Sequence, residues 1–478
     1  MKMAAGALLG VLLLSSAALP YWGGLEAEKH YRALHQRLRS ESLGSLDVHE
    51  SFERGWLHST AETQVSTGAG GWITLRHTIK HGPLPLAELL DGRRPRDWIV
   101  SSVETEYSPT PESHPWLAQA LAGEALVQVQ TTLHADGHST SELRSPALRN
   151  EALGLVWHGA TGRVHIPRTL ESASGSIESA GLELKREGRT IRVGSLAAQF
   201  DATLSAQGLP LGDASISLGS LEVSASRRGS VLLSARNWLL TQSSREDEEH
   251  VLQMRLTLRL EDFTRQNERF GPAEVALVLN NIDAVALQRL RGRHRVASEA
   301  RLAPEQRRIV MAAAIIESLP LLLARSPGLE LTRLRIQSPS GELSAAAKLS
   351  FDGDQIAALL DPSLLQQALN ASAEFRVPAQ MVDYGMDAYL ETLLPVPEPG
   401  NASAVPERAL RRLRLTQVRK QLLQRLTAAK VFTREGYFFA ARLEYRDGQV
   451  LFNGQAVDLD SLSSLAQPAT LQATTDPL

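Results

Sequence analysis

Four consecutive residues near the start of the chain combine chemistry that suits recognition: Glu53, Arg54, Gly55 and Trp56. Two opposite charges, a glycine and a large aromatic ring suit a turn that contacts a ligand or a protein. The same residues also fit a structural role, in which the glycine forms a β-bulge, Trp56 packs and Arg54 pairs with a carboxylate. The sequence leaves both interpretations open.

A second group of candidate residues lies on a basic helix, which the apolar spacing predicts over Glu407–Lys430. Residues 401–430 hold eight basic side chains and one acidic side chain, a net charge of +7. Near anionic lipid, each Lys or Arg contributes about 1 kcal/mol to binding. A solvated face above an apolar contact is the alternative. The candidates for contact with a membrane or a protein partner are Arg411, Arg412, Arg419 and Lys420.

The remaining chemistry-bearing residues form no familiar catalytic motif. The chain has no Gly-x-Ser-x-Gly, no phosphate-binding loop ending in Lys-Ser/Thr and no His-Glu-x-x-His. His134 and His138 flank a predicted hairpin tip and could share a metal ion, but no third ligand is evident nearby in the sequence. We therefore predict no catalytic, cofactor-binding or metal-binding residues and no cofactor.

The composition excludes several broad classes of function. The 478 residues are 43% hydrophobic and 22% charged, which is ordinary for a folded chain. The net charge of −3 argues against a nucleic-acid partner. It is the sum of +7 in residues 401–430 and −10 in the rest of the chain. The chain has no cysteine, which excludes disulfides, thiolate metal sites and a cysteine nucleophile.

The first residues of the chain predict a membrane-anchored protein. No residue between Lys2 and Glu26 is charged, and the apolar stretch is marginally long enough to span about 30 Å as a helix. We expect residues 3–22 to contact the lipid bilayer as an uncleaved anchor, with Tyr21 and Trp22 at the interface. A cleaved signal peptide is the alternative. Both interpretations place the bulk of the chain on the far side of a membrane.

Period-two alternation of apolar and polar residues dominates the rest of the chain. This pattern predicts antiparallel strands with one apolar face, and Asp-Gly pairs predict hairpin turns between them. Strands are predicted at residues 127–133, 196–204, 252–260, 329–351 as a hairpin, and 437–452 as a terminal hairpin, and those at 196–204 and 252–260 are the clearest. Helices are predicted at residues 284–291, 305–324, 354–370 and 378–394. We therefore expect an α+β, β-rich fold of large twisted antiparallel sheets with covering helices, elongated and preceded by one N-terminal transmembrane helix.

Changes of pattern along the chain suggest six segments. They are a membrane anchor or signal segment at 1–24, a helical stalk at 25–43, an antiparallel β-rich region at 44–290, a mixed helix and hairpin region at 291–400, the basic helix and terminal hairpin at 401–463, and a disordered tail at 464–478. The proline-rich composition near residue 400 is typical of a linker or long loop.

Several short motifs, taken in order, resemble the YdgA-like bacterial family of unknown function. They are Ser51–Ser59, His81–Leu84, Phe270–Pro272 with Leu279–Asp283, and Gly448–Gly454. Phe52 departs from the tyrosine that the family more often has there. The resemblance implies an envelope protein of Gram-negative bacteria, anchored in the inner membrane by a single pass and facing the periplasm. It transfers no catalytic residues, because none are established for the family.

The sequence supports hypotheses of three different classes. We expect a non-enzymatic, inner-membrane-anchored periplasmic protein that binds an apolar, lipid-like ligand or supports an envelope assembly. Two curved sheets can leave an apolar groove for acyl chains, although helices can cover the same strand faces. The alternatives are a scaffold that docks an envelope protein partner through its basic helix, and an envelope hydrolase whose site is assembled from distant residues.

Overall fold

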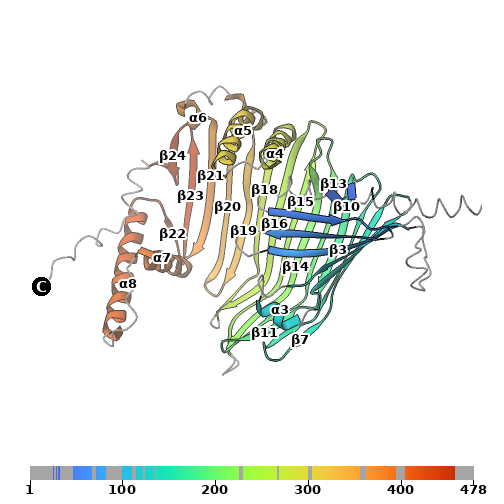
Figure 1. The fold of residues 1–478 in the computed structure, drawn as a ribbon. Helices are drawn as coiled ribbons and strands as arrows, with labels where there is room; N and C mark the ends of the chain where they lie inside the picture. Colours follow the sequence, from blue (N-terminus) through green and yellow to red (C-terminus); the bar gives the residue numbers. More distant parts are fainter. Residues whose placement is uncertain are drawn as a thin grey trace, which may run out of the picture. The chain divides into compact units, whose positions relative to one another are not determined.

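The computed structural model divides the chain into two compact units, both built on antiparallel strands (Figure 1). Unit 1 comprises Met1–His250 and Asp283–Leu319, and unit 2 comprises Val251–Ile282 and Pro320–Leu478. The chain therefore leaves unit 1, returns to it and leaves it again. The residues that the structure describes are 25, 28–29, 31–32, 47–56, 58–66, 72–81, 99–109, 115–121, 124–134, 136–225, 230–265, 268–299, 304–355, 362–393 and 404–457.

Unit 1 consists mainly of strands. Their bounds are β1 Asp47–Glu53, β2 His58–Ser66, β3 Trp72–His81, β4 Ile99–Tyr107, β5 Val127–His134, β6 Ser139–Ser145, β7 Leu148–Asn150, β8 Leu155–Trp157, β9 Ala160–Ile166, β10 Ser172–Ser179, β11 Leu182–Arg186, β12 Arg189–Val193, β13 Leu196–Leu204, β14 Pro210–Ala225 and β15 Val231–Glu246. Its helices are α3 Pro115–Leu121, α4 Ala284–Glu299 and most of α5 Pro304–Ala324.

The main sheet of unit 1 is antiparallel throughout. Hydrogen-bonded neighbours follow the order β1, β2, β3, β4, β5, β6, β9, β10, β13, β14, β15. A branch of β7, β8, β11 and β12 joins the far end of β14 through β12. Figure 1 shows how strongly this sheet twists, because β3 runs across the view whereas β14 and β15 run up it.

The register of this sheet aligns residues into rows that cross all of these strands. One row is mainly apolar: Phe52, Ala61, His77, Thr105, Val129, Leu143, Gly162, Ile177, Ala198, Ile216 and Leu240. The adjacent row is polar: Glu53, Thr60, Thr78, Glu104, Gln130, Glu142, Arg163, Ser176, Gln199, Ser215 and Thr241. Because successive residues point to opposite sides of a sheet, unit 1 has an apolar face and a polar face.

Unit 2 is also built on antiparallel strands, together with helices. Its strands are β16 Val251–Arg265, β17 Glu268–Phe270, β18 Ala273–Asp283, β19 Gly328–Ser338, β20 Gly341–Phe351, β21 Leu369–Pro378, β22 Thr433–Glu435, β23 Phe438–Arg446, β24 Gln449–Phe452 and β25 Gln455–Ala456. Its helices are α6 Pro362–Ala368, α7 Ala379–Leu393 and α8 Ala404–Ala428. The order across the sheet is β16, β18, β19, β20, β21, β23, β24, β25.

Three phenylalanines of unit 2 form two ring pairs that share Phe432. Phe432 lies 5.8 Å from Phe375 and 6.1 Å from Phe439, measured between ring centroids. Phe439 is only 7% exposed. The helices contribute a separate set of buried leucines, which are Leu390 on α7 and Leu415 and Leu422 on α8.

The β-rich fold with a large antiparallel sheet is the one predicted, and the strong hairpins lie where the alternation places them. One helix boundary is wrong, because the helix expected to reach Asn370 ends at Ala368 and Leu369 opens β21. The alternation of Leu369, Ala371, Ala373 and Phe375 explains this, since these side chains line one face of that strand.

The predicted anchor at residues 3–22 and the tail at 464–478 lie outside the described residues. Within the described part of the chain, no helix combines the length and apolar character needed to cross a membrane. Of the expected stalk at 25–43, the described residues Leu25, Glu28, Lys29, Tyr31 and Arg32 are helical. These five residues are called the N-terminal helical segment below.

Candidate functional site

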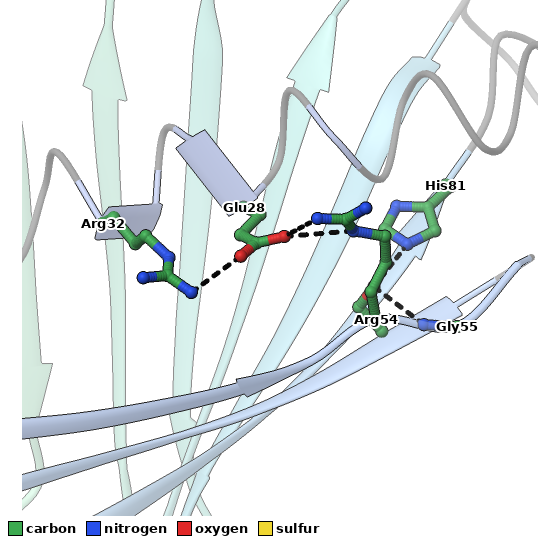
Figure 2. Close-up of polar contacts among 6 residues, drawn as sticks. Glu28, Arg32, Arg54, Gly55 and His81 are labelled. Atoms are coloured by element: carbon green, nitrogen blue, oxygen red, sulfur yellow. Dashed lines mark hydrogen bonds and ion pairs between the residues drawn. The ribbon is translucent and has the colours of Figure 1, made fainter.

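The predicted recognition residues lie at the turn between β1 and β2, and the turn is held by an ion pair with the N-terminal helical segment. The Arg54 guanidinium donates to Glu28 through Nε at 3.0 Å and also through Nη2. Arg32 donates to the other oxygen of Glu28 at 2.8 Å, as Figure 2 shows. The hydrogen bond from Arg54 holds the pKa of the Glu28 carboxyl below its usual value. Arg54 therefore pairs with a carboxylate, the structural alternative noted from the sequence.

Gly55 is required at this turn by a close approach of the backbone. A Cβ atom at this position would lie 2.0 Å from the carbonyl oxygen of His58. The Gly55 amide instead donates to Ser59 Oγ at 3.4 Å. The turn thus needs glycine at this position whether or not it contacts a ligand.

Ser59 and His81 bring together two motifs that are separate in the sequence. Ser59 Oγ and His81 Nε2 share a hydrogen bond of 2.7 Å. Both side chains are buried, with Ser59 1% and His81 4% exposed. Burial lowers the pKa of His81, and nearby His58 lowers it further. The pair resembles a nucleophile and its base only in composition, because a substrate could not reach a Ser59 hydroxyl that is almost wholly covered.

A ladder of polar side chains continues from this pair across the apolar face. The Tyr31 hydroxyl donates to the Glu62 carbonyl oxygen at 3.1 Å and shares a hydrogen bond of 2.8 Å with Thr63 Oγ1. His77 then bridges Thr63 and Thr105, with both hydrogen bonds at 2.8 Å. The Tyr31 ring also lies 5.5 Å from Phe52 and from His77 between centroids. The N-terminal helical segment therefore packs, through Tyr31, against Thr63 and His77 on the apolar face.

The other two predicted recognition residues point outward. Trp56 is 57% exposed, so the packed tryptophan of the structural alternative is not observed. Glu53, the last residue of β1, is also exposed. Glu53 and Trp56 therefore lie at the surface of the turn, whereas Arg54 and Gly55 hold it.

The predicted histidine pair meets at the tip of the β5–β6 hairpin. His134 and His138 stack at 4.0 Å between ring centroids, and His165 lies 5.4 Å from His138. Asp136 accepts a hydrogen bond from the His138 backbone, which is the main reason that its pKa is lowered. Although a third histidine is nearby, no group of three metal-ligating side chains in the described residues has the geometry to hold a metal ion.

The predicted docking residues of the basic helix lie on α8. Arg419 is turned inward, where it contacts Asp387 and lies 3.3 Å from Asp383, both on α7. Lys420 is exposed. Arg411 and Arg412 belong to the helix, but their side chains lie outside the described part of the structure. Arg419 thus joins two helices of unit 2 rather than projecting toward a partner.

An exposed apolar surface in the described part of unit 1 lies on β10, β13 and β14. Ile177, Leu196, Phe200, Leu204 and Ile216 are 37–47% exposed. Their registers place all of them on the apolar face. Small residues lie beside these large ones, since a Cβ at Gly175 would contact the Phe200 ring at 2.6 Å. No sequence motif marks this surface, because it is assembled only by pairing strands.

Unit 2 has a polar hollow, which is lined mainly by residues of β19, β20, β21 and β23. The hollow has a volume of about 490 Å³, and small residues such as Ser344 and Ala346 form part of its lining. Its arginines are paired with carboxylates: Arg333 with Glu274, Arg335 with Glu342, Arg376 with Glu435 and Arg442 with Glu444. The hollow therefore has little unbalanced charge to offer an ionic ligand.

The remaining family motifs have structural roles in unit 2 and at the start of α4. Asn453 donates to the carbonyl oxygen of Lys430 at 2.7 Å and accepts from the Arg442 amide at 2.8 Å, which joins the end of α8 to β23. Gly271 has φ +113 and a following cis peptide bond. Asp283 caps α4 by accepting from the Ala286 amide at 2.8 Å.

These features define a β-rich antiparallel protein whose motifs hold turns and helix ends. The chain belongs to a family described as "Bacterial protein of unknown function (DUF945)", whose model matches residues 1–460. This confirms the predicted membership in a bacterial family of unknown function. No curated protein and no solved structure matches the chain.

Proposed function

We propose that this protein is a non-enzymatic, inner-membrane-anchored periplasmic protein that binds the acyl chains of a lipid-like ligand on the apolar face of unit 1. One observation carries the proposal. Large apolar side chains on β10, β13 and β14 are 37–47% exposed and lie side by side on one face. Contiguous apolar surface of this kind marks a binding site more often than an ordinary protein surface.

The chemistry of this face suits an acyl chain. Across β9, β10, β13, β14 and β15 the apolar row contains no charged or polar side chain. The next row on the same face runs through Val164, Gly175, Phe200 and Ala214 before it meets a polar residue at Gln242. At about 4.8 Å between strands, the four strands from Ile177 to Leu240 span about 14 Å. A flexible hydrocarbon chain fits such a surface, because it needs no hydrogen-bonding partner.

The alternatives draw less support from the described residues. A partner that docks on α8 through Arg419 must compete with Asp383 and Asp387. A hydrolase built on Ser59 and His81 must first uncover a pair that is at most 4% exposed. The acyl-chain proposal needs no such rearrangement.

Native mass spectrometry of the full chain, gently extracted from its host membrane, tests the proposal. We expect co-purified lipid on the wild-type protein and loss of most of that lipid in Ile216→Asp, because a carboxylate in the apolar row is costly to desolvate. Ile216 is 41% exposed, so the variant should still fold.

Ser215→Asp is the matched control. It places the same carboxylate on the same strand, one residue away, on the polar face of the sheet. Lipid should remain bound to this variant. Equal lipid occupancy in Ile216→Asp and Ser215→Asp, or no lipid on the wild-type chain, would contradict the proposal.

A further inference from the structure

We infer that helix α5 lies against the membrane surface and places an outward-facing stripe of aliphatic residues in the interface of an anionic bilayer. The inference rests on the membrane anchoring proposed above and adds a second, separate contact with lipid. The stripe lies in unit 1 and comprises Ile309, Ala312, Ala313 and Ile316. It is called the outer stripe of α5 below.

The outer stripe reverses the usual orientation of a surface helix. Ile309 and Ile316 are each 69% exposed, and the two alanines between them are also exposed. The other three residues follow Ile309 by three, four and seven positions, so all four share one side of the helix. The buried side of α5 carries small residues instead, with Ala314 at 3% and Ser318 at 4% exposed. Because a surface helix normally turns its large apolar residues toward the core, the stripe has the character of a contact surface.

The neighbouring helix α4 extends this surface (Figure 1). Arg293 on α4 donates to Glu317 on α5 at 3.0 Å, which places the two helices side by side. Val296 lies one helical turn after Arg293 on the same side of α4 and is 60% exposed. Arg289 lies one turn before Arg293 and is also exposed. The surface thus combines aliphatic side chains with arginines, as helices that lie in a membrane interface do.

The charge of this surface favours an anionic occupant. Residues 284–319 hold seven arginines, three glutamates and no lysine or aspartate, a net charge of +4. Of the two glutamates whose side chains the structure describes there, Glu305 lies in the first turn of α5 and Glu317 is already paired. Arg289 and Arg308 are exposed and form no ion pair within the described residues. A second copy of the chain would bring two positive surfaces together, whereas an anionic bilayer attracts them.

The aliphatic character of the outer stripe favours lipid over an acidic protein partner. The centres of protein interfaces are enriched in aromatic residues and methionine, whereas this stripe holds only isoleucine and alanine. These side chains need neither a hydrogen-bonding partner nor a shaped pocket, and the hydrocarbon edge of a bilayer offers neither. A bilayer surface therefore matches both the stripe and the arginines beside it.

Site-specific labelling tests this inference, since the chain has no cysteine. Ile316→Cys in the full chain is labelled with an environment-sensitive fluorophore and reconstituted into vesicles of phosphatidylethanolamine and phosphatidylglycerol that carry a headgroup-level nitroxide quencher. We expect blue-shifted emission and several-fold stronger quenching than for a control label at Glu187→Cys, which lies at the β11–β12 turn of the same unit. Replacing phosphatidylglycerol with phosphatidylcholine should weaken the quenching at Ile316→Cys.

Charge variants test the role of the arginines. Arg289→Gln and Arg308→Gln, both added to Ile316→Cys, should shift the equilibrium of the label away from the membrane by about fivefold for each arginine removed. Arg149→Gln with Arg168→Gln is the matched control, because it removes two exposed arginines of the same unit outside α4 and α5. Equal effects of the two pairs on the quenching would overturn the inference.

Flotation of the vesicles and crosslinking separate the possible failures. A chain that floats with the vesicles but shows equal quenching at Ile316→Cys and Glu187→Cys overturns this inference and leaves the proposed function intact. Disulfide formation between two Ile316→Cys chains, with weak quenching, assigns the outer stripe to a second copy and also overturns it. A wild-type chain that does not float with the vesicles overturns both the anchoring and the membrane contact of α5.

Discussion

The exposed strand surfaces of the two units differ in kind. On β10, β13 and β14 of unit 1, large apolar side chains remain exposed and small residues lie between them. On β19, β20, β21 and β23 of unit 2, the polar hollow is lined by arginines, each paired with a glutamate. Unit 2 also exposes Met254 and Leu256 on β16, and Leu329 and Leu349 as a cross-strand pair on β19 and β20.

The difference shows that an antiparallel sheet in this chain need not leave a broad apolar surface uncovered. In unit 2, Phe432 packs against Phe375 and Phe439, and Phe439 is buried. Unit 1 instead leaves Phe200 37% exposed. The fold could have covered these apolar residues of unit 1, but it leaves them exposed. This exposure suggests that they have a function.

The largest expected effect contrasts one phenylalanine from each unit. Phe439→Ala should lower the free energy of unfolding by about 3–4 kcal/mol, because a buried ring leaves a cavity. Phe200→Ala should cost about 1 kcal/mol, since much of its ring is already in contact with solvent. Urea denaturation of the full chain in detergent measures both values. Equal losses would show that Phe200 serves the fold as much as Phe439 does.

The next effect tests the turn that ends β1. Gly55→Ala places a Cβ against the His58 carbonyl oxygen, which belongs to the backbone and cannot move aside easily. We expect a loss of about 2–3 kcal/mol, as is typical of overpacking. Gly188→Ala is the control, because its Cβ would meet no atom within 4 Å and only the positive φ of +73 opposes it. That variant should lose about 1 kcal/mol, and a larger loss than for Gly55→Ala would refute the steric explanation.

A smaller effect is expected where Tyr31 of the N-terminal helical segment packs on β2. Tyr31→Phe keeps the ring contacts with Phe52 and His77 but removes the hydrogen bonds to Glu62 and Thr63. The cost should be about 1 kcal/mol. Hydrogen exchange of the β2 amides should accelerate, whereas exchange in β21 should not change. Unchanged exchange in β2 would mean that the N-terminal helical segment does not hold this end of the sheet.

The smallest effect is a pH dependence of stability near His81 on β3. Burial lowers the pKa of His81, so the unfolded chain binds a proton at higher pH than the folded chain does. Stability is therefore complete above the ordinary histidine pKa of about 6.5 and declines as the pH falls below it. Hydrogen exchange of β3 amides, corrected for intrinsic rates, should report this decline. His81→Gln should flatten it, and an unchanged slope in that variant would assign the decline to another group.

Much of the fold could be predicted from the sequence, because strand alternation is a local signal. The hairpins at β5–β6, β19–β20 and β23–β24 lie where alternation and turn residues place them. β21 was missed because it directly follows a helix, so the two periodicities overlap at Leu369. The division into two units could not be predicted, because each unit combines segments that are distant in the chain.

The candidate site depended more on long-range pairing. The sequence marked Arg54 and Trp56, but it could not show that Arg54 pairs with Glu28 or that Trp56 stays exposed. Ser59 and His81 belong to separate motifs and meet only because β2 pairs with β3. The apolar face is harder to predict than these contacts, since a shift of one residue in any strand pair would break its rows.

Photo-crosslinking in living cells tests the central claim most directly. A photoreactive phenylalanine analogue is placed at Ile216 on the apolar face, at Ser215 on the polar face, or at Ala346 in the polar hollow of unit 2. We expect a lipid adduct at Ile216, identified by mass spectrometry of the crosslinked peptide, and little or none at the other two positions. Equal lipid capture at all three positions, or capture of protein alone at Ile216, would contradict the assignment of the apolar face of unit 1 to acyl-chain binding.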